Sequence, residues 1–448
     1  MIEVIKFNSD TKEKIIDRLI SRTDHFYEQF SKPLEGNREI FGKPLTPLES
    51  VRQILGEIQK DGDIAVCKYS EIFDKVIPDP YLVGSAEIKN SYQLVNEEVV
   101  EALKVSIENV SAYQKRMLPN DISLEKNGNA TTGAYYHPIE RVGIYIPGGT
   151  APLCSSVIMN ALPAIIAGVP EVVVFTPPQR DGTVDPGVLV ACDLIGIKEI
   201  YRVGGIPAIG MMAYGTSTFK KVCKIAGPGN SFVALAKKEV VGYVDIDLFA
   251  GPSEILILAD ETANKEFVAA DMIAQAEHDK VASSILITTS IELAESLNEE
   301  LDKQLEDLPR KEIASYSLKN YGFVIVVDNI SDGITLSNLV APEHLELCVD
   351  NPNQYLNDIK NTGAIFLGNY SPEAAGDYLA GPSHTLPTSG TGKFYSGVSA
   401  DTFIRRTSII HYDQIDFEKD SPLIASIAKI EQLEGHARSA LIRLGKTI

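Results

Sequence analysis

Short runs of β-branched residues alternate with longer helical stretches through most of the chain after residue 141. The first series of runs is VGIYI, EVVVF, EIYRV and KVCKIA, with helical patterns at about 154–168, 185–196 and 231–241. The second series is EILILA (254–259), ASSILIT (282–288), GFVIVV (322–327), LELCV (345–349) and AIFLG (364–368). Strands that alternate with helices are typical of parallel sheets with right-handed crossovers. The pattern therefore predicts an α/β fold with two Rossmann-like parallel-sheet modules.

The two ends of the chain are patterned differently. Residues 1–45 are polar and helix-prone, and Thr46 and Glu49 are spaced as a capping box that opens a helix to about residue 60. The pattern from Ser421 to Leu444 predicts one helix, with Ser421 as its cap and a proline at its first position. We expect four parts: a helical segment at 1–45, a first α/β domain formed by 46–141 plus 255–398, a second α/β domain at 142–254, and a helical tail at 399–448.

Composition and charge narrow the function classes. Hydrophobic residues make up 44% of the chain and charged residues 23%, as in ordinary globular proteins. No apolar run is long enough to span a membrane and no basic-then-apolar leader occurs, so we expect a cytoplasmic protein. The formal net charge of −20 repels phosphate backbones and anionic lipids, which argues against nucleic-acid and membrane partners. The five cysteines form no CxxC pair, so any metal site must use imidazole, carboxylate and amide ligands.

Three glycine-rich turns follow strands of the first series: PGGTAP (147–152), GGIPAIG (204–210) and GPGN (227–230). Glycine lets a ligand approach the backbone, and the next helix offers its N-terminal amides to a phosphate. None of the three matches GxGxxG, so this module would be an incomplete dinucleotide fold. The three turns are equally consistent with a nucleotide-binding role and with ordinary chain reversals between strands and helices.

Two groups of polar residues suggest chemistry. Asp271, Gln275 and His278 fall on one helical face, where an amide oxygen and an imidazole could share a cation. That spacing alone favours a polar helix end over a metal site. Glu343 and His344 precede an apolar strand and suit two different proton transfers. Because neighbours in an extended segment point opposite ways, we do not expect both to be buried.

Two other histidines occur in contrasting contexts. Asp377 and His384 lie in a glycine-rich loop, where polar groups are usually exposed or functional. His436 lies in the middle of the predicted tail helix beside apolar neighbours, and by itself it is interpreted as structural.

Seven stretches that span nearly the whole chain resemble histidinol dehydrogenase in order and spacing. They are RVGIYIPGGTAP, KIAGPGN, DLFAGPSEILILADE, DMIAQAEHD, APEHLEL, SPEAAGDYLAGPSHTLPTSG and IEQLEGHA. The resemblance implies an NAD-dependent enzyme that oxidises L-histidinol to L-histidine in two steps at the end of histidine biosynthesis. It also implies a zinc-containing homodimer with a domain-swapped C-terminal segment.

The same resemblance implies roles for individual residues. One zinc ion per subunit would be held by Gln275, His278, Asp377 and, from the partner subunit, His436. His344 would take the alcohol proton, and Glu343 would activate water to attack the aldehyde. The substrate would be lined by these zinc ligands and His344 together with Ser253, His384 and Glu431. NAD would contact Tyr145 and Asn230.

One position departs from the family pattern. Members usually read GGAQAIA where this chain reads GGIPAIG, so Pro207 replaces a glutamine that contacts NAD. Proline offers neither a side-chain hydrogen bond nor a backbone N–H, which implies an altered contact. Two alternatives therefore stay open: a related dehydrogenase of another small alcohol, such as a sulfonated propanediol, and a zinc-binding derivative without NAD chemistry. Glu343 beside His344 argues against the second.

Overall fold

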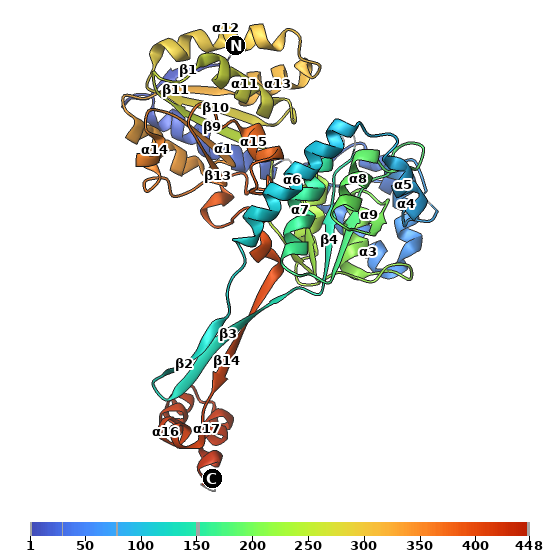
Figure 1. Ribbon diagram of the computed structural model, residues 1–448, viewed down its shortest axis with the longest axis vertical. Coiled ribbons are helices and arrows are strands. Elements are labelled where there is room, and N and C mark those ends of the chain that lie inside the picture. The colour runs from blue at the N-terminus through green and yellow to red at the C-terminus, as the bar shows by residue number, and fades with distance from the viewer. Residues whose placement is uncertain (1, 29, 78, 149–152, 446–448) are drawn as a thin grey trace.

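The chain forms two α/β lobes that lie side by side and a long arm that extends away from them (Figure 1). The computed structural model describes residues 2–28, 30–77, 79–148 and 153–445. Each lobe is built around one parallel sheet, which confirms the predicted fold class. Among the described residues, no helix is long and apolar enough to cross a membrane.

The first lobe, called the six-stranded lobe, contains a sheet of six strands in which all neighbouring strands are parallel. In spatial order the strands are β1 (Val4–Lys6), β11 (Phe323–Val326), β10 (Ser283–Thr288), β9 (Glu254–Ala259), β12 (His344–Cys348) and β13 (Ala364–Leu367). The chain builds outward from β9 through β10 and β11 on one side, and through β12 and β13 on the other. The strand order therefore reverses between β9 and β12, as in doubly wound folds.

Helices cover both faces of this sheet. One face packs against α11 (Lys265–Ala276), α12 (Ile291–Leu305) and α13 (Lys311–Tyr321). The other face packs against α1 (Lys12–Glu28) and α14 (Ile330–Val340). The short helix α15 (Glu373–Tyr378) follows β13 and contacts α11. Because both faces are covered, strands such as β9 and β10 are buried along their whole length, and their central residues are apolar.

The five-stranded lobe contains a second parallel sheet. Its strands are, in spatial order, β6 (Glu199–Tyr201), β5 (Glu171–Phe175), β4 (Arg141–Tyr145), β7 (Lys224–Ala226) and β8 (Asp245–Ile246). One face packs against α3 (Pro47–Asp61), α4 (Asp63–Phe73), α9 (Gly205–Tyr214) and α10 (Ser231–Glu239). The other packs against α5 (Ser85–Ser91), α6 (Glu97–Lys115), α7 (Cys154–Ile166) and α8 (Pro186–Leu194). The switch point of this sheet lies between β4 and β7.

The arm consists of a three-stranded antiparallel sheet that ends in a helical tip (Figure 1). Its strands, in spatial order, are β14 (Ile404–His411), β3 (Ala130–Pro138) and β2 (Ile122–Asn127). The tip is formed by α16 (Gln414–Ile430) and α17 (Glu434–Leu441). The remaining short elements are α2 (Asn37–Phe41) and the 3₁₀ turns η1 (Pro352–Tyr355), η2 (Thr391–Lys393), η3 (Ala400–Phe403) and η4 (Ile442–Leu444).

The N-terminal half packs differently from the expected grouping. Residues 1–45 are not purely helical, because β1 pairs with β11 and completes the six-stranded sheet. The helices between Pro47 and Lys115 cover the five-stranded sheet, whereas we expected residues 46–141 to accompany 255–398. An amphipathic helix reveals that it has a buried face but not which sheet that face covers. The capping box at Thr46 is confirmed, with reciprocal bonds between Thr46 and Glu49.

The prediction of one helix from Ser421 to Leu444 is wrong. The first tail helix, α16, starts at a cap formed by Asp413, whose carboxylate accepts the N–H of Asp416. It continues through the proline that follows Ser421 and stops at a turn where Gln432 has a φ of +60°. Ser421 is buried and donates its hydroxyl to a carbonyl of α17, so it joins the two helices instead of capping one.

Candidate active site

A cavity of about 180 Å³ lies between the two lobes. The five-stranded lobe lines it with loops from the carboxyl edge of its sheet, including residues 228–229 after β7 and 250–251 after β8. The six-stranded lobe lines it from the amino ends of β9 and β12, the end of α11, and α15. Seven of the predicted site residues meet there: Ser253, Gln275, His278, Glu343, His344, Asp377 and His384.

The backbone of Glu254, the first residue of β9, holds both predicted proton-transfer residues. The N–H of Glu254 donates to Glu343 Oε2 at 2.9 Å, and its carbonyl oxygen lies 3.2 Å from His344 Nδ1. A carbonyl oxygen only accepts, so Nδ1 carries the proton and the lone pair of the neutral imidazole is on Nε2. That Nε2 is buried and has no hydrogen-bond partner among the described residues. His344 therefore presents a ready proton acceptor to the cavity.

Both residues of this pair are buried, with 5% and 3% of their surfaces exposed, contrary to the expectation that at most one would be. The reason is that Glu343 lies just before β12 and turns its carboxylate back toward the Glu254 amide. His344 Nδ1 and Glu343 Oε2 are 3.8 Å apart. Side chains point to opposite faces only within a strand, and Glu343 precedes His344, the first residue of β12.

Burial sets the protonation of the pair. Burial raises the pKa of Glu343 well above its ordinary value, and the nearby Asp377 adds to this effect. Burial also lowers the pKa of His344 to about 3, with smaller contributions from His278 and His384. Both groups are therefore neutral at neutral pH without a further charge. A cation in the cavity would favour the Glu343 carboxylate.

Three side chains, one from the turn after α11 and two from α15, surround a candidate metal position. Ligand atoms of His278, Glu373 and Asp377 all lie within 4.8 Å of one another. Glu373 was missed by the sequence analysis, although it is four residues before Asp377 and therefore on the same helical face. Burial raises the pKa of Asp377 to about 6, and His278 opposes this rise. Glu373 Oε2 is buried and has no hydrogen-bond partner among the described residues.

Gln275 borders this cluster. Its Oε1 lies 3.1 Å from His344 Nδ1, and its Nε2 is buried without a hydrogen-bond partner among the described residues. A half-turn of the amide would direct the oxygen to the cluster, while His344 kept its bond to the Glu254 carbonyl. An imidazole, carboxylates and an amide oxygen form a donor set that suits Zn²⁺. The unpartnered buried atoms and the donor chemistry together fit a zinc ion.

His384 connects the lobes beside the cluster. Its Nε2 lies 3.1 Å from the hydroxyl of Ser156 on α7, and its Nδ1 lies 3.1 Å from the carbonyl oxygen of Asp377. Nδ1 therefore donates and Nε2 accepts. Burial lowers the pKa of His384 to about 4, which keeps this bridge neutral. The bridge ties α15 to the five-stranded lobe.

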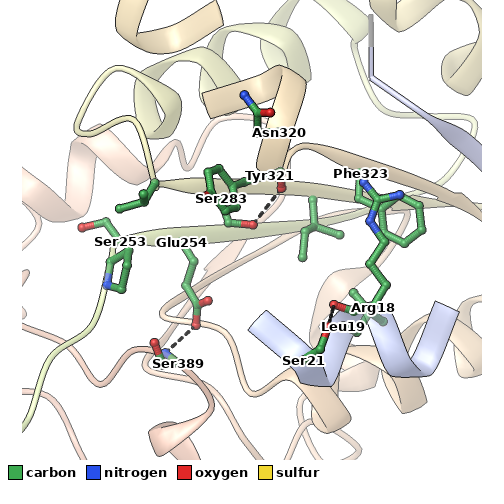
Figure 2. Close-up of a pocket in the computed structure, with 13 residues that line it drawn as sticks. Arg18, Leu19, Ser21, Ser253, Glu254, Ser283, Asn320, Tyr321, Phe323 and Ser389 are labelled. Carbon is green, nitrogen blue, oxygen red and sulfur yellow. Dashed lines mark hydrogen bonds between the residues drawn. The ribbon is translucent and has the colours of Figure 1, made fainter. Parts of the chain in front are cut away.

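Ser253 lines both this cavity and a second one of about 330 Å³. Figure 2 shows the second cavity, where Arg18 and Ser21 of α1 face the starts of three strands. The Glu254 side chain points along its wall and accepts the N–H of Ser389 at 3.0 Å. Glu254 thus holds the proton-transfer pair with its backbone and the loop that follows His384 with its side chain.

The predicted NAD contacts lie at the carboxyl edge of the five-stranded sheet. Tyr145 ends β4, and its buried hydroxyl accepts the N–H of Gly205 at 3.0 Å. Asn230 follows β7 and caps α10 by accepting two backbone N–H groups. Pro207 is buried near the start of α9. Part of the PGGTAP loop, residues 149–152, lies outside the described residues.

The first glycine of GPGN has a packing role. Gly227 has a φ of +110°, and a Cβ there would lie 2.1 Å from the carbonyl oxygen of Tyr145. Any larger residue would push the loop away from β4. Crevices at the carboxyl ends of strands beside a switch point are where α/β sheets bind nucleotides. The β4 and β7 loops flank that position here.

The family to which the chain belongs follows from its similarity to known proteins. A family model described as histidinol dehydrogenase matches residues 45–444. This chain belongs to the histidinol dehydrogenase family. The family resemblance of its seven motifs is thereby confirmed.

Relatives in the histidinol dehydrogenase family match most of the chain. Proteins named histidinol dehydrogenase from Clostridium acetobutylicum and Bacillus subtilis are 48% and 46% identical to it. The matches cover 88% and 87% of this chain and 92% of each relative. The crystal structure of histidinol dehydrogenase from Elizabethkingia anophelis aligns with a TM-score of 0.88 and 37% identity, over 99% of this chain and 98% of that one.

Two of the predicted zinc and substrate residues are not in the cavity of the same chain. Glu431 lies at the end of α16 and His436 lies in α17, and both are exposed. These helices form the tip of the arm, far from the cavity between the lobes (Figure 1). Within one chain of this histidinol dehydrogenase family member, His436 therefore does not join Gln275, His278 and Asp377.

Proposed function

We propose that this protein is a zinc-containing, NAD-dependent histidinol dehydrogenase that oxidises L-histidinol through L-histidinal to L-histidine. Membership of the family supports this proposal. The observation that carries it is the pair formed by Glu343 and His344, held by the backbone of Glu254 beside a cluster of side chains that could bind a metal. A scaffold or simple binding protein has no need of two proton-transfer groups there.

The first oxidation uses His344. The lone pair on its Nε2 takes the hydroxyl proton of the alcohol, while the carbon loses a hydride and becomes an aldehyde. The Glu254 carbonyl keeps the opposite ring nitrogen protonated, so the imidazolium that forms retains a hydrogen bond. NAD⁺ held by the five-stranded lobe would supply the hydride acceptor for both oxidations.

The second oxidation uses Glu343. As a carboxylate it removes a proton from water as the water oxygen bonds to the aldehyde carbon, which gives a hydrate. The hydrate then loses a hydride from carbon and a proton from oxygen, and the product is a carboxylic acid. The Glu254 N–H fixes the carboxylate for this step. The ionised form requires a positive charge nearby, because burial alone raises the pKa of Glu343.

We propose that zinc is held by Gln275, His278 and Asp377 of one chain and by His436 from a second copy. Bound zinc would supply an anchor for the amino and imidazole nitrogens of the substrate, which orients the alcohol toward His344. Glu373 lies close enough to contribute. Ser253, His384 and Glu431 would complete the substrate pocket.

We further propose a homodimer in which the arms are exchanged. The tip of the arm exposes large apolar side chains, which are Ile415, Leu423, Ile427, Ile430, Leu433 and Ile442. Such a surface favours burial against a partner, and a two-fold exchange would cover both tips at once. The exchange would also bring Glu431 and His436 to the other chain's cavity, which is incomplete without them.

The remaining proposals concern the cofactor, the binding partners and the cellular location. We propose that NAD binds the five-stranded lobe beside Tyr145 and Asn230, with Pro207 replacing a side-chain contact by a buried apolar one. The net charge of −20 supports a protein without nucleic-acid or membrane partners, and we place it in the cytoplasm.

A substrate panel tests this function. The zinc-loaded full-length protein should oxidise L-histidinol with NAD⁺ far faster than other small alcohols, including a sulfonated propanediol. Preference for another alcohol would replace the proposed substrate. Zinc binding without turnover of any alcohol would favour the non-dehydrogenase alternative.

A further inference from the structure

Three elements carry the proposed zinc ligands and the proton acceptor. Helix α11 and the turn that follows it carry Gln275 and His278, β12 begins with His344, and α15 carries Asp377. The cavity works only if these three elements keep their relative positions. One buried side chain, Glu346, contacts all three.

We propose that Glu346, paired with Asp271, is a positioning residue that locks α11, β12 and α15 together behind the zinc ligands. This inference rests on the proposed zinc site. Neither residue touches the cavity, and the role acts through hydrogen bonds to the elements that line it.

Glu346 bonds directly to the start of α15. It lies two residues after His344 on β12, so both side chains point to the same face of the sheet. Only 1% of its surface is exposed. Its Oε1 accepts the N–H of Glu373, the first residue of α15, at 2.8 Å. No side chain caps this helix at its N-cap position, so the Glu346 carboxyl satisfies a backbone donor that would otherwise be buried and unpaired.

The Glu346 carboxyl also reaches α11. It lies against the carboxyl of Asp271, which is one helical turn before Gln275. Two carboxyl groups can bond only when one of them carries a proton. Glu346 Oε2 is buried and has no hydrogen-bond partner among the described residues, so we place that proton on it.

The proton belongs to Glu346 rather than to Asp271. Burial raises the pKa of Glu346 to about 9, and the Asp271 charge adds to that rise. Burial raises the pKa of Asp271 only to about 6, because the bond from Glu346 opposes the rise. Neutral Glu346 therefore accepts from Glu373 through one oxygen and donates to Asp271 through the other. Asp271 and Gln275 thus face the same side of β12, as their spacing predicts, with Asp271 beside Glu346 and Gln275 beside His344.

Because of these contacts, glutamine at position 346 should preserve the hydrogen bonds, whereas leucine should remove them. The amide of Glu346→Gln has the same shape, accepts through its oxygen and donates through its nitrogen. Glu346→Leu leaves the Glu373 N–H and the Asp271 carboxylate buried without partners, so α15 can shift relative to α11. Loss of a partner that orients metal ligands typically weakens metal binding by roughly 10–100-fold.

The test measures zinc affinity of the metal-free full-length protein by competition with a fluorescent chelator, together with the thermal midpoint. Glu346→Gln should bind zinc within about threefold of the unmodified protein, and Glu346→Leu roughly 10–100-fold more weakly. Leu347→Ala is the matched control, because Leu347 is fully buried on the opposite face of β12. It should lower the thermal midpoint but leave zinc affinity unchanged.

Several results would overturn the inference. Equal loss of zinc affinity in Glu346→Leu and Leu347→Ala would mean that Glu346 only supports the fold. Weak zinc binding by Glu346→Gln would exclude a protonated Glu346 that donates to Asp271. If Glu346→Leu does not fold, Asp271→Ala removes the acceptor from the other side and should weaken zinc binding similarly. Failure of the unmodified protein to bind zinc would instead overturn the proposed zinc site, and this inference with it.

Discussion

Replacing Glu343 by glutamine should separate the two oxidations. Glutamine keeps the side-chain oxygen that accepts the Glu254 N–H, now at 2.9 Å from Glu343 Oε2, so the cavity wall should be preserved. What is lost is the carboxylate that removes a proton from water. General-base catalysis contributes roughly 10²–10⁴-fold, which corresponds to about 3–5 kcal/mol of the activation barrier. We therefore expect the second oxidation to slow by that factor and the first to stay within about threefold.

Single-turnover kinetics can resolve the two steps. Enzyme in excess over L-histidinol should form the first NADH at the normal rate and then accumulate the aldehyde, and L-histidinal supplied directly should be oxidised as slowly as the accumulated aldehyde. Equal slowing of both steps would refute the separate roles of Glu343 and His344. A lower thermal midpoint with unchanged rates would show that the carboxyl serves only the fold.

Three other perturbations probe different parts of the account. His344→Asn removes the lone pair on Nε2 and should slow the first oxidation by roughly 10²–10⁴-fold, and normal alcohol oxidation by this variant in a steady-state assay would exclude His344 as the base. Ile430→Glu places a charge on the tip of the arm, where 85% of the Ile430 surface is exposed. This variant should lower both the dimer fraction in analytical ultracentrifugation and the zinc affinity. An unchanged dimer fraction would contradict the exchange of arms. Burial raises the pKa of Asp74 to about 6, so its ionised form is disfavoured in the folded chain and its contribution to stability falls as the pH rises from about 4 through 6. Asp74→Asn can keep the bond to the Gly204 N–H and should raise the free energy of unfolding by on the order of 1–2 kcal/mol at pH 8 in urea titrations, with a smaller gain at pH 5, and an equal gain at both values would contradict this origin.

Local signals in the sequence predicted local structure well. The capping box at Thr46 formed as expected because its two hydrogen bonds involve residues three apart. The two series of β-branched runs predicted two parallel sheets, since a strand covered on both faces is apolar along its length. By contrast, β1 has only three residues, and nothing within three residues shows that they pair with a strand more than three hundred positions away.

In the candidate site too, residues close in the sequence could be predicted, whereas contacts between distant segments could not. Gln275 and His278, or Glu343 and His344, could be found because they are close in the sequence, one pair at the end of a helix and the other at the start of a strand. The hold of Glu254 on the proton-transfer pair escaped the sequence because it uses backbone atoms, which every residue possesses. Glu373 escaped because its distance from Asp377 is informative only once the segment is known to be helical.

The number of NADH molecules formed per L-histidinol tests the central claim most directly. Zinc-loaded full-length protein, supplied with limiting L-histidinol and excess NAD⁺, should form two NADH and one L-histidine for each substrate molecule, with no aldehyde detectable by a carbonyl trap. A single NADH with released aldehyde, or no NADH at all, would contradict the assignment of two oxidations to one cavity.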